Sequence, residues 1–306
     1  MSSVRSSFVK DFSQEIACVF RRALLALALV PSVGWAARQG SVLLYPTALK
    51  TGVNLLAGKA WQEPNKKHAP HAVARQGRGG PLDEGAVTLA LTNDHREFAY
   101  WTMPVTGLRT NRTYFIGAWT RITSARLLFW WSGTSAESGK TVDARVYCSS
   151  GCNAELARYF DDDIRRRLTG DPDAWRLVSR TFALPGPIVG GESRVEYGFF
   201  GEPGEATFAD PFLIDITDLP QTIEVVLKGA QPVKKLVVIR SDTRDPEWRR
   251  EFATPVTDFA ETLPAHIPAF EGMACHPMFG RVLLVYYADG TEDRVACPQE
   301  GLFIRR

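Results

Sequence analysis

Short runs of β-branched and aromatic residues follow one another along the chain, and turns rich in glycine and proline separate them. Three of these runs are AVTLALT (86–92), TYFIGAWTRIT (113–123) and ARLLFWWSG (125–133). Runs of this length and composition are typical of β-strands. Because the strands are short, closely spaced and accompanied by almost no helical pattern, the sequence predicts an antiparallel β-sandwich.

The remaining strands of this region are expected at 41–46, 53–58, 96–108, 141–148, 174–186, 193–201 and 206–217. A polar stretch rich in glycine and proline, 65–85, is expected to be a loop. The segment 153–173 differs, because its apolar residues recur every four positions, at Leu156, Phe160, Ile164 and Leu168. This spacing puts them on one face of a helix, which we interpret as an insertion between two strands.

A second group of strands is expected after Pro220, at 221–229, 233–241 and 281–297, with one short helix between 256 and 268. Within the last run, Asp289-Gly290 is a strong signal for a two-residue hairpin turn. The sequence therefore predicts a β-sandwich domain at 37–219. A small β-rich or α+β domain at 220–306, large enough to fold alone, is expected to follow it.

The first 36 residues have the pattern of a secretory signal peptide. An apolar run at 23–30 follows basic residues, and the small residues Gly34 and Ala36 suit a cleavage site. The run is too short to span a bilayer comfortably, and no later segment is long and apolar enough. We therefore predict an exported protein, periplasmic or extracellular, with no transmembrane segment in the mature chain. An uncleaved amphipathic anchor is the alternative.

Removing this leader leaves a chain without net charge. The sequence has 36 basic and 34 acidic residues, and residues 1–36 hold four and two of these, so 32 of each remain. Neutrality argues against nucleic acid or an anionic membrane as the main partner.

The mature chain keeps an even number of cysteines, which is consistent with export to an oxidising compartment. These are Cys148, Cys152, Cys275 and Cys297. Proximity in the sequence favours the pairs Cys148–Cys152 and Cys275–Cys297, although three pairings are open. A zinc site is the rival reading, and a Cys-x3-Cys spacing without a second well-spaced pair supports it poorly.

Four phrases between residues 53 and 217 occur in the order found in a known family. They are NLLAGKAW, MPVTGLRTNRTYFIGAWTRI, DAWRLVSRTFALPG and ATFADPFLIDIT. Together they resemble carbohydrate-binding modules built on the galactose-binding-like jelly roll. The resemblance covers a little over half of the chain, and it implies a non-catalytic domain that binds glycans. Residues 221–306 show no such resemblance.

A glycan-binding face should combine aromatic rings, which stack on the C–H faces of sugars, with charged groups that bind hydroxyls. Adjacent predicted strands offer such residues, and the predicted ligand-binding set is Trp101, Trp119, Arg121, Trp130, Asp143, Arg145 and Tyr147. Trp130 is preferred to Trp131, although the phase of the strand is not fixed by the sequence. For each tryptophan the alternative is a place in the core.

Asp210 lies in an apolar strand, where an acid needs a reason. The family resemblance implies that an acid in this strand helps to bind a structural calcium ion, and Asp210 is the matching position. Lys59 stands where the family would have a second acidic ligand, which argues against the ion. The alternative is that Asp210 caps a turn or pairs with an arginine. No other cofactor is expected.

Signatures of catalysis are missing from the sequence. There is no Gly-x-Ser-x-Gly, phosphate loop, dinucleotide fingerprint or zinc-protease motif. The leading interpretation is therefore a secreted or periplasmic, non-catalytic glycan-binding protein. A jelly-roll module that binds another envelope protein is the alternative. A glycan-active enzyme, with isolated acids such as Glu97, Asp143 and Glu196 pairing as a dyad, is the third reading.

Overall fold

The computed structural model is built almost entirely from antiparallel β-sheets, as the sequence predicts. It describes residues 41–300 except 84, 123–126, 149–174, 185, 201–202, 241–242, 268, 270–280 and 298. Two pairs of sheets, each pair with its own buried core, make up this part of the chain. The predicted helix at 153–173 lies outside the described residues.

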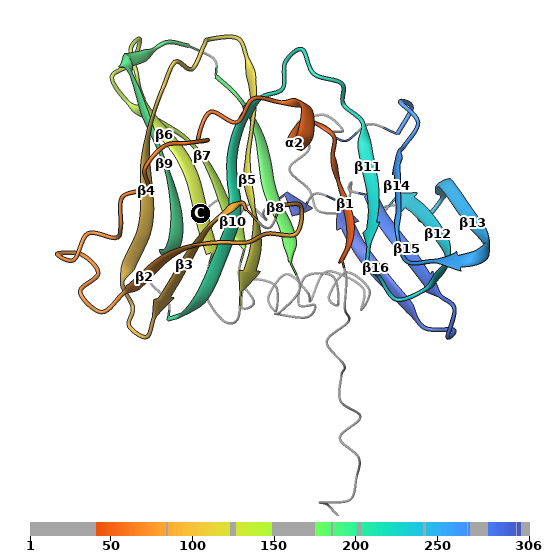
Figure 1. Ribbon diagram of the computed structural model, residues 1–306. Helices are drawn as coiled ribbons and strands as arrows, with labels where there is room; N and C mark the ends of the chain where they lie inside the picture. Colours follow the sequence, from red (N-terminus) through yellow and green to blue (C-terminus); the bar gives the residue numbers. More distant parts are fainter. Residues whose placement is uncertain are drawn as a thin grey trace, which may run out of the picture. The chain divides into compact units, whose positions relative to one another are not determined.

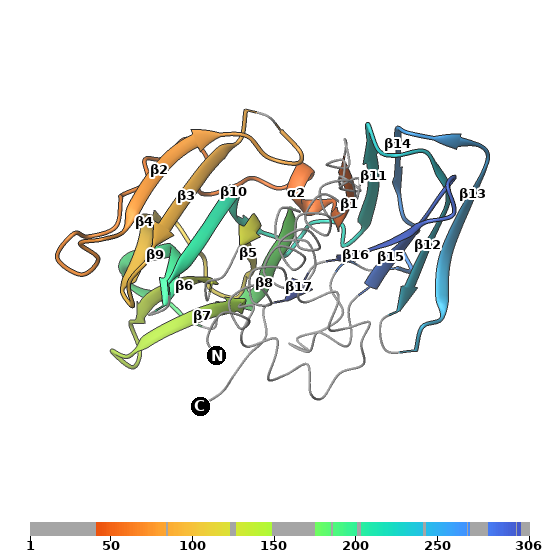
Figure 2. The ribbon, with the colours of Figure 1, turned by 90° about the horizontal axis from the view of Figure 1, so that it is seen from below.

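The first sandwich consists of two sheets that face each other (Figures 1 and 2). The six-stranded sheet has the order β17-β8-β5-β10-β3-β2, and the four-stranded sheet has the order β4-β9-β6-β7. In the first, the strands are β17 (Gln299–Glu300), β8 (Arg176–Ala183), β5 (Thr113–Ile122), β10 (Gly204–Asp215), β3 (Val87–Asn93) and β2 (Val73–Arg78). In the second, they are β4 (Phe98–Thr106), β9 (Ile188–Phe200), β6 (Leu127–Ser135) and β7 (Thr141–Cys148).

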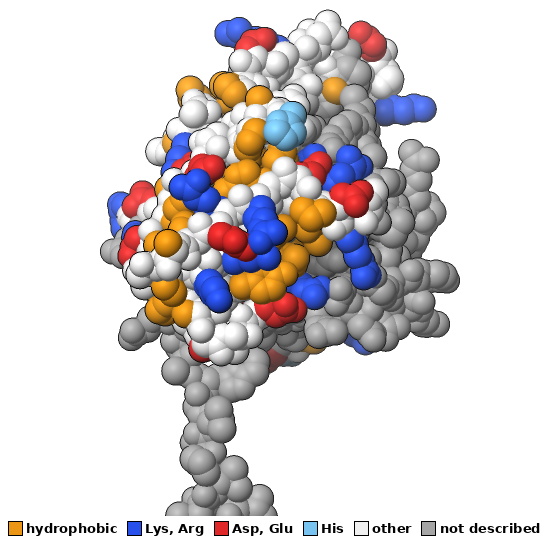
Figure 3. Space-filling view, turned by 90° about the vertical axis from the view of Figure 1, so that its right-hand side faces the viewer, with side chains coloured by type: hydrophobic (Ala, Val, Ile, Leu, Met, Phe, Trp, Pro, Cys, Tyr) orange, Lys and Arg blue, Asp and Glu red, His pale blue; other side chains and the backbone are white. Residues whose placement is uncertain are grey.

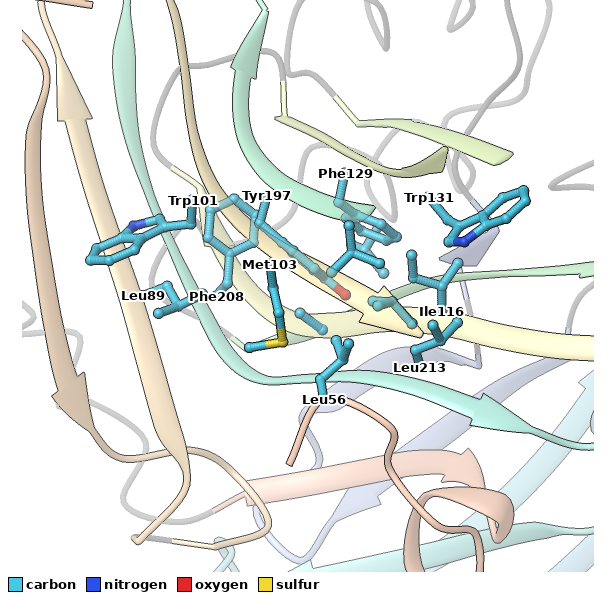
Figure 4. Close-up of a cluster of buried hydrophobic side chains, with 14 of the residues drawn as sticks. Leu56, Leu89, Trp101, Met103, Ile116, Phe129, Trp131, Tyr197, Phe208 and Leu213 are labelled. Atoms are coloured by element: carbon cyan, nitrogen blue, oxygen red, sulfur yellow. The ribbon is translucent and has the colours of Figure 1, made fainter. Parts of the chain in front are cut away.

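The core between these sheets is filled by large side chains that alternate along the strands (Figure 4). Trp101, Phe129, Trp131 and Tyr197 point inward from the four-stranded sheet and are at most 2% exposed. The Tyr197 hydroxyl donates a hydrogen bond to the carbonyl of Gly117 in the facing sheet, at 2.8 Å. Inward positions are thereby fixed, and every second residue on these strands faces the other way.

The second sandwich pairs the sheet β1-β11-β14 with the sheet β13-β12-β15-β16. Its strands are β1 (Ser41–Pro46), β11 (Ile223–Lys228), β14 (Phe259–Thr262), β13 (Pro246–Val256), β12 (Val233–Arg240), β15 (Arg281–Tyr287) and β16 (Glu292–Cys297). The hairpin turn predicted at Asp289-Gly290 is confirmed, because it joins β15 to β16 and Gly290 has φ +88°. On the side of the molecule in Figure 3, acidic, basic and hydrophobic side chains are interspersed.

Strand β1 precedes the first sandwich in the sequence, yet it pairs with β11 of the second along its whole length. Leu44, on one face of β1, is buried in the second core. Leu43 and Tyr45, on the other face, pack with Phe115 and Trp119 of β5. The outer face of β5 is therefore covered by β1 and by the one-turn helix α2 (Ala48–Thr51). The predicted boundary near residue 220 stays a prediction.

Three expectations about local structure are wrong. Residues 53–58 form turns instead of a strand, and Asn54 Oδ1 accepts a hydrogen bond from the Leu56 backbone at 3.0 Å. The expected loop at 65–85 contains β2, which is a strand because β3 offers it a complete set of backbone partners. The short helix expected between 256 and 268 is replaced by β14, which pairs with β11.

Candidate functional site

The candidate site is the outward face of the four-stranded sheet. Ala99 and Trp101 point into the core from β4, so Tyr100 between them points out. Val195 and Tyr197 do the same on β9, which turns Glu196 outward. On β6, Phe129 and Trp131 are buried, and Trp130 faces out. Strand alternation thus gathers Tyr100, Glu196 and Trp130 on one face.

Trp130 and Tyr100 form an edge-to-face pair. Their ring centroids are 4.8 Å apart and the rings are inclined by 82°. Both side chains are half-buried. Gly198 of β9 lies opposite Tyr100 in the ladder, and a Cβ atom there would come within 1.9 Å of the Ala99 carbonyl oxygen. The sheet therefore requires glycine at position 198.

Glu196 lies next to this pair, opposite Trp130 on one side and Thr102 on the other. The residue is only 5% exposed. Its Oε2 atom lies 3.5 Å from Nε of Arg194, and it accepts no hydrogen bond from any residue that the structure describes. Burial raises the pKa of Glu196, and the positive charge of Arg194 opposes this increase. One oxygen of an outward-facing carboxylate thus has no hydrogen-bond donor in the described part of the chain.

Tyr100 and Arg194 lie close enough to this carboxylate to interact with its charge. Burial together with the negative charge of Glu196 raises the pKa of Tyr100 to about 12, so its hydroxyl stays protonated at neutral pH. Arg194 is mostly exposed, and its Nε also lies 3.4 Å from the Ser132 hydroxyl oxygen. The face therefore combines two aromatic rings, a neutral phenol donor, a carboxylate acceptor and an exposed cation.

Chemically, this combination suits a ligand with both apolar and hydroxyl-bearing surfaces. The ring faces accept C–H groups by stacking, and the buried carboxylate accepts hydrogen bonds strongly because it is screened from water. Leaving such an atom unpaired costs about 1–3 kcal/mol in an unliganded protein. A ligand that donates to Glu196 removes that cost.

The structure brings only some of the predicted site residues to this face. Trp130 is on it, and β7 lies beside β6 with Asp143, Arg145 and Tyr147 opposite Ser132, Trp130 and Leu128 in register. The side chain of Asp143 is exposed. The side chains of Arg145 and Tyr147 lie outside the described residues, so their role stays a prediction.

Trp101, Trp119 and Arg121 lie elsewhere. Trp101 is 1% exposed in the first core, where its indole N–H donates to the Ala90 carbonyl at 3.2 Å. Trp119 is 3% exposed beneath β1. Their burial favours the core alternative that the sequence left open. Arg121 is exposed on β5, in the other sheet, with its guanidinium 4.1 Å from the ring centre of Trp175.

The expectation that the face of Trp119 and Arg121 joins the face of Asp143 and Arg145 is therefore wrong. These residues belong to β5 and β7, which are in different sheets. Sequence reasoning missed Tyr100 as a site residue, and it considered Glu196 only as one acid of a catalytic dyad, not as part of a binding face. The signal for Glu196 was present, because an acid between Val195 and Tyr197 interrupts an apolar strand.

Asp210 lies at an irregularity of β10. The register with β5 shifts between Ala209 and Phe212, and Asp210 has φ +49°. Burial, and then the negative charge of Asp83, raise the pKa of Asp210. Asp83 and Asp210 are the residues able to contribute carboxylates to a cation here. Within the described part of the chain, no group of three or more acidic, histidine or cysteine side chains is positioned to hold a metal ion. The calcium ion stays a prediction.

The cysteine predictions also stay open. The backbones of Cys148 and Cys297 end β7 and β16, whereas Cys152 and Cys275 lie outside the described residues, as do the side chains of all four.

Several solved structures are similar to this chain. The enzymatically active domain of tailspike protein 4 from bacteriophage CBA120 matches 51% of the chain at 10% identity, with a TM-score of 0.36, and the match covers 19% of that domain's own length. The xylan-binding CBM22-1 domain of Xyn10C from Paenibacillus barcinonensis matches 60% of the chain and 99% of its own length, at 10% identity and a TM-score of 0.35.

TmCBM61, solved with β-1,4-galactotriose, matches 53% of the chain and 99% of its own length, at 13% identity and a TM-score of 0.33. Most of the similar structures are carbohydrate-binding modules, the class that residues 53–217 resemble in sequence. At this level of similarity, no residue role is transferred from them. No family model and no curated protein matches the chain. Among the helices that the structure describes, none is long and apolar enough to cross a membrane.

Proposed function

We propose that the protein binds glycans on the outward face of the sheet β4-β9-β6-β7. The observation that supports this most strongly is Glu196 Oε2, which is buried beside the rings of Trp130 and Tyr100 and has no hydrogen-bond donor among the described residues. Buried polar atoms in folded proteins are normally paired, and exceptions call for an explanation. Oε2 is closed to solvent in this structure, so a sugar ring stacked on Trp130 donates a hydroxyl to it by displacing the exposed side chain of Arg194.

The three groups have separate roles in this proposal. Trp130 and Tyr100 provide an angled aromatic surface for the C–H face of one sugar ring. Glu196 orients that ring by accepting from its hydroxyls, and Arg194 is long enough to donate from the rim. The proposed binding is non-catalytic. Glu196 alone can orient a sugar, whereas glycoside hydrolysis would need a second carboxylic acid at a fixed distance from it.

The remaining predictions from the sequence complete this picture. The protein is exported to the periplasm or the cell exterior after removal of residues 1–36, where polysaccharide is accessible. In that oxidising compartment, the four cysteines that remain after residue 36 are proposed to form two disulfide bonds. Another envelope protein as the partner is the alternative, and it predicts binding that no glycan displaces.

Affinity electrophoresis in gels that contain a polysaccharide tests the proposal. Xylan and β-1,4-galactan are suitable first ligands, since sugars of these kinds are named for two of the similar structures. We expect one of the polysaccharides tested to retard the wild-type protein. Glu196→Gln and Trp130→Ala should migrate as they do in a gel without ligand. Val189→Ala, at an exposed position of β9, is the matched control and should be retarded like the wild type. Equal retardation of all four proteins would contradict the proposal.

A further inference from the structure

Strand β2 forms an open edge of the six-stranded sheet. It pairs with β3 on one side only, and every residue from Val73 to Arg78 except Ala74 is exposed. The segment 64–82, which includes β2 and the loop before it, contains Lys66, Lys67, Arg75 and Arg78 but no aspartate or glutamate. We call these four residues with β2 the basic edge. Its charge contrasts with the neutral balance of the mature chain.

Carbonyl groups hold two cations of the basic edge. Lys66 Nζ donates to the carbonyl of Ala72 at 2.5 Å, and one Arg78 terminal nitrogen donates to the carbonyl of Gly85 at 3.0 Å. A carbonyl orients a cation without neutralising it. Among the described residues, none of the four cations forms a salt bridge. Lys66 is therefore held just before β2 and Arg78 at its last residue, and neither has a carboxylate partner among the described residues.

Two acids beside this segment are engaged with other groups. Glu97 contacts the imidazole of His71, and Asp83 Oδ1 accepts from the backbone N–H of Gly85 at 2.8 Å. Strand β13 of the second sandwich differs from the basic edge, because its Arg249 has an acidic partner, Glu251. Figure 3 shows the same mixing of signs over that side of the molecule. An unneutralised run of cations attracts a partner of opposite charge.

Arg75 and Arg78 are three residues apart on a strand, so they point to opposite faces of the sheet, roughly 10 Å apart along its edge. A chain lying along the edge can thus be contacted from both sides. The apolar side chains of β2 are limited to Val73 and Ala74, which gives little side-chain specificity for an added peptide strand. Recognition here depends on charge repeated along a line.

We propose that the basic edge binds a linear anionic polysaccharide with carboxylate or sulfate groups along its length. This site is distinct from the face of Trp130, because β2 and β6 belong to different sheets. The two sites would allow one protein to recognise a neutral and an anionic glycan separately.

Binding of fluorescent polygalacturonate, dextran sulfate and neutral dextran to the full-length mature protein tests this inference. The variants are Arg75→Glu/Arg78→Glu and, as a control with the same change of net charge, Lys228→Glu/Lys234→Glu at two other exposed positions. We expect the wild type to bind at least one of the two anionic polymers, but not dextran. Binding should weaken steeply as salt rises. The Arg75/Arg78 variant should bind about tenfold more weakly and the control within about twofold of the wild type.

Equal losses in both double variants would overturn the inference, since net charge alone would explain them. Absence of binding to both anionic polysaccharides would also overturn the inference. The role left for these charges would then be to prevent another strand from pairing with the open edge of the sheet. Binding of a polyglutamate peptide without either polysaccharide would assign the edge to a protein partner instead. Trp130→Ala should keep its affinity for the anionic polymer, which separates this result from failure of the proposed function.

Discussion

The rings of Trp130 and Tyr100 meet edge to face at 4.8 Å on the outside of a sheet, 30 residues apart in the sequence. The next residue, Trp131, stacks on Phe182 in the core with 4.9 Å between ring centres. Two adjacent tryptophans therefore serve opposite sides of one sheet, and substitutions at the two positions should have different consequences.

Trp131→Ala should destabilise the protein strongly, and Trp130→Ala should not. Trp131 is 2% exposed, and removing a buried indole costs about 3–5 kcal/mol. Trp130 is half-buried, so Trp130→Ala should lower the free energy of unfolding by only about 1 kcal/mol. Most of this loss comes from the contact with Tyr100. Urea unfolding followed by circular dichroism measures both. Equal losses for the two variants would show that Trp130 is a core residue.

Glu196→Gln should increase stability at neutral pH. The pKa of Glu196 is raised in the folded state, so the folded protein binds its proton more tightly than the unfolded chain. The stability contributed by this group is then fully present below the ordinary glutamate pKa of 4.5 and is lost as the pH rises through the folded-state pKa. Glutamine does not ionise. We expect the variant to be more stable than wild type by about 1 kcal/mol at pH 7, and the difference to vanish near about pH 4.

This pH series also tests whether Glu196 lowers the stability of the protein, as expected of a residue present for ligand binding. A residue that lowers stability and is required for binding is typical of a ligand site. A wild-type protein that is more stable than Glu196→Gln at pH 7 would mean that the carboxylate has a structural partner.

The segment 220–306 should require residues 41–46 to fold. Leu44 of β1 is 1% exposed in the second core, and β1 supplies six residue pairs to β11. The isolated fragment therefore lacks a strand and exposes the edge of β11. We expect a fragment with 41–46 fused ahead of residue 220 through a flexible linker to give dispersed amide resonances. The fragment without this addition should give a collapsed spectrum, and dispersed resonances from it would contradict the assignment of β1.

Calcium should stabilise the protein through Asp210 and Asp83. A bound cation relieves the repulsion and desolvation that raise the pKa of Asp210. We expect millimolar calcium to raise the melting temperature by a few degrees, on the order of 1–2 kcal/mol, and a chelator to reverse the change. Asp210→Asn should abolish the response while keeping the left-handed backbone conformation that asparagine tolerates. A calcium-independent melting temperature in the wild type would exclude the ion.

The β-sandwich was predictable because strand formation and hairpin turns leave local signals. The run TYFIGAWTRIT corresponds to β5 and RVLLVYYADGTEDRVAC to the hairpin of β15 and β16. The edge strand β2 was missed, since Gly77 and two arginines resemble a loop and the strand is stabilised by pairing with β3 alone.

The site was predicted only in part, because alternation alone does not identify the core face of a strand that is buried on both sides. On β5, Ile116 and Ala118 fill the first core, while Phe115 and Trp119 lie beneath β1. An apolar second face must be covered, and no local signal in the sequence shows that Leu43 and Tyr45 cover it. Tyr100, Trp130 and Glu196 meet through the order β4-β9-β6, a long-range arrangement with no local signal.

A glycan array probed in parallel with wild-type residues 37–306 and with the same chain carrying Trp130→Ala tests whether the outward face of the sheet β4-β9-β6-β7 binds glycans. We predict that the wild type binds a related group of oligosaccharides and that the variant, equally folded, binds none of them. Identical profiles for the two proteins, or no bound glycan for the wild type, would contradict glycan binding on this face.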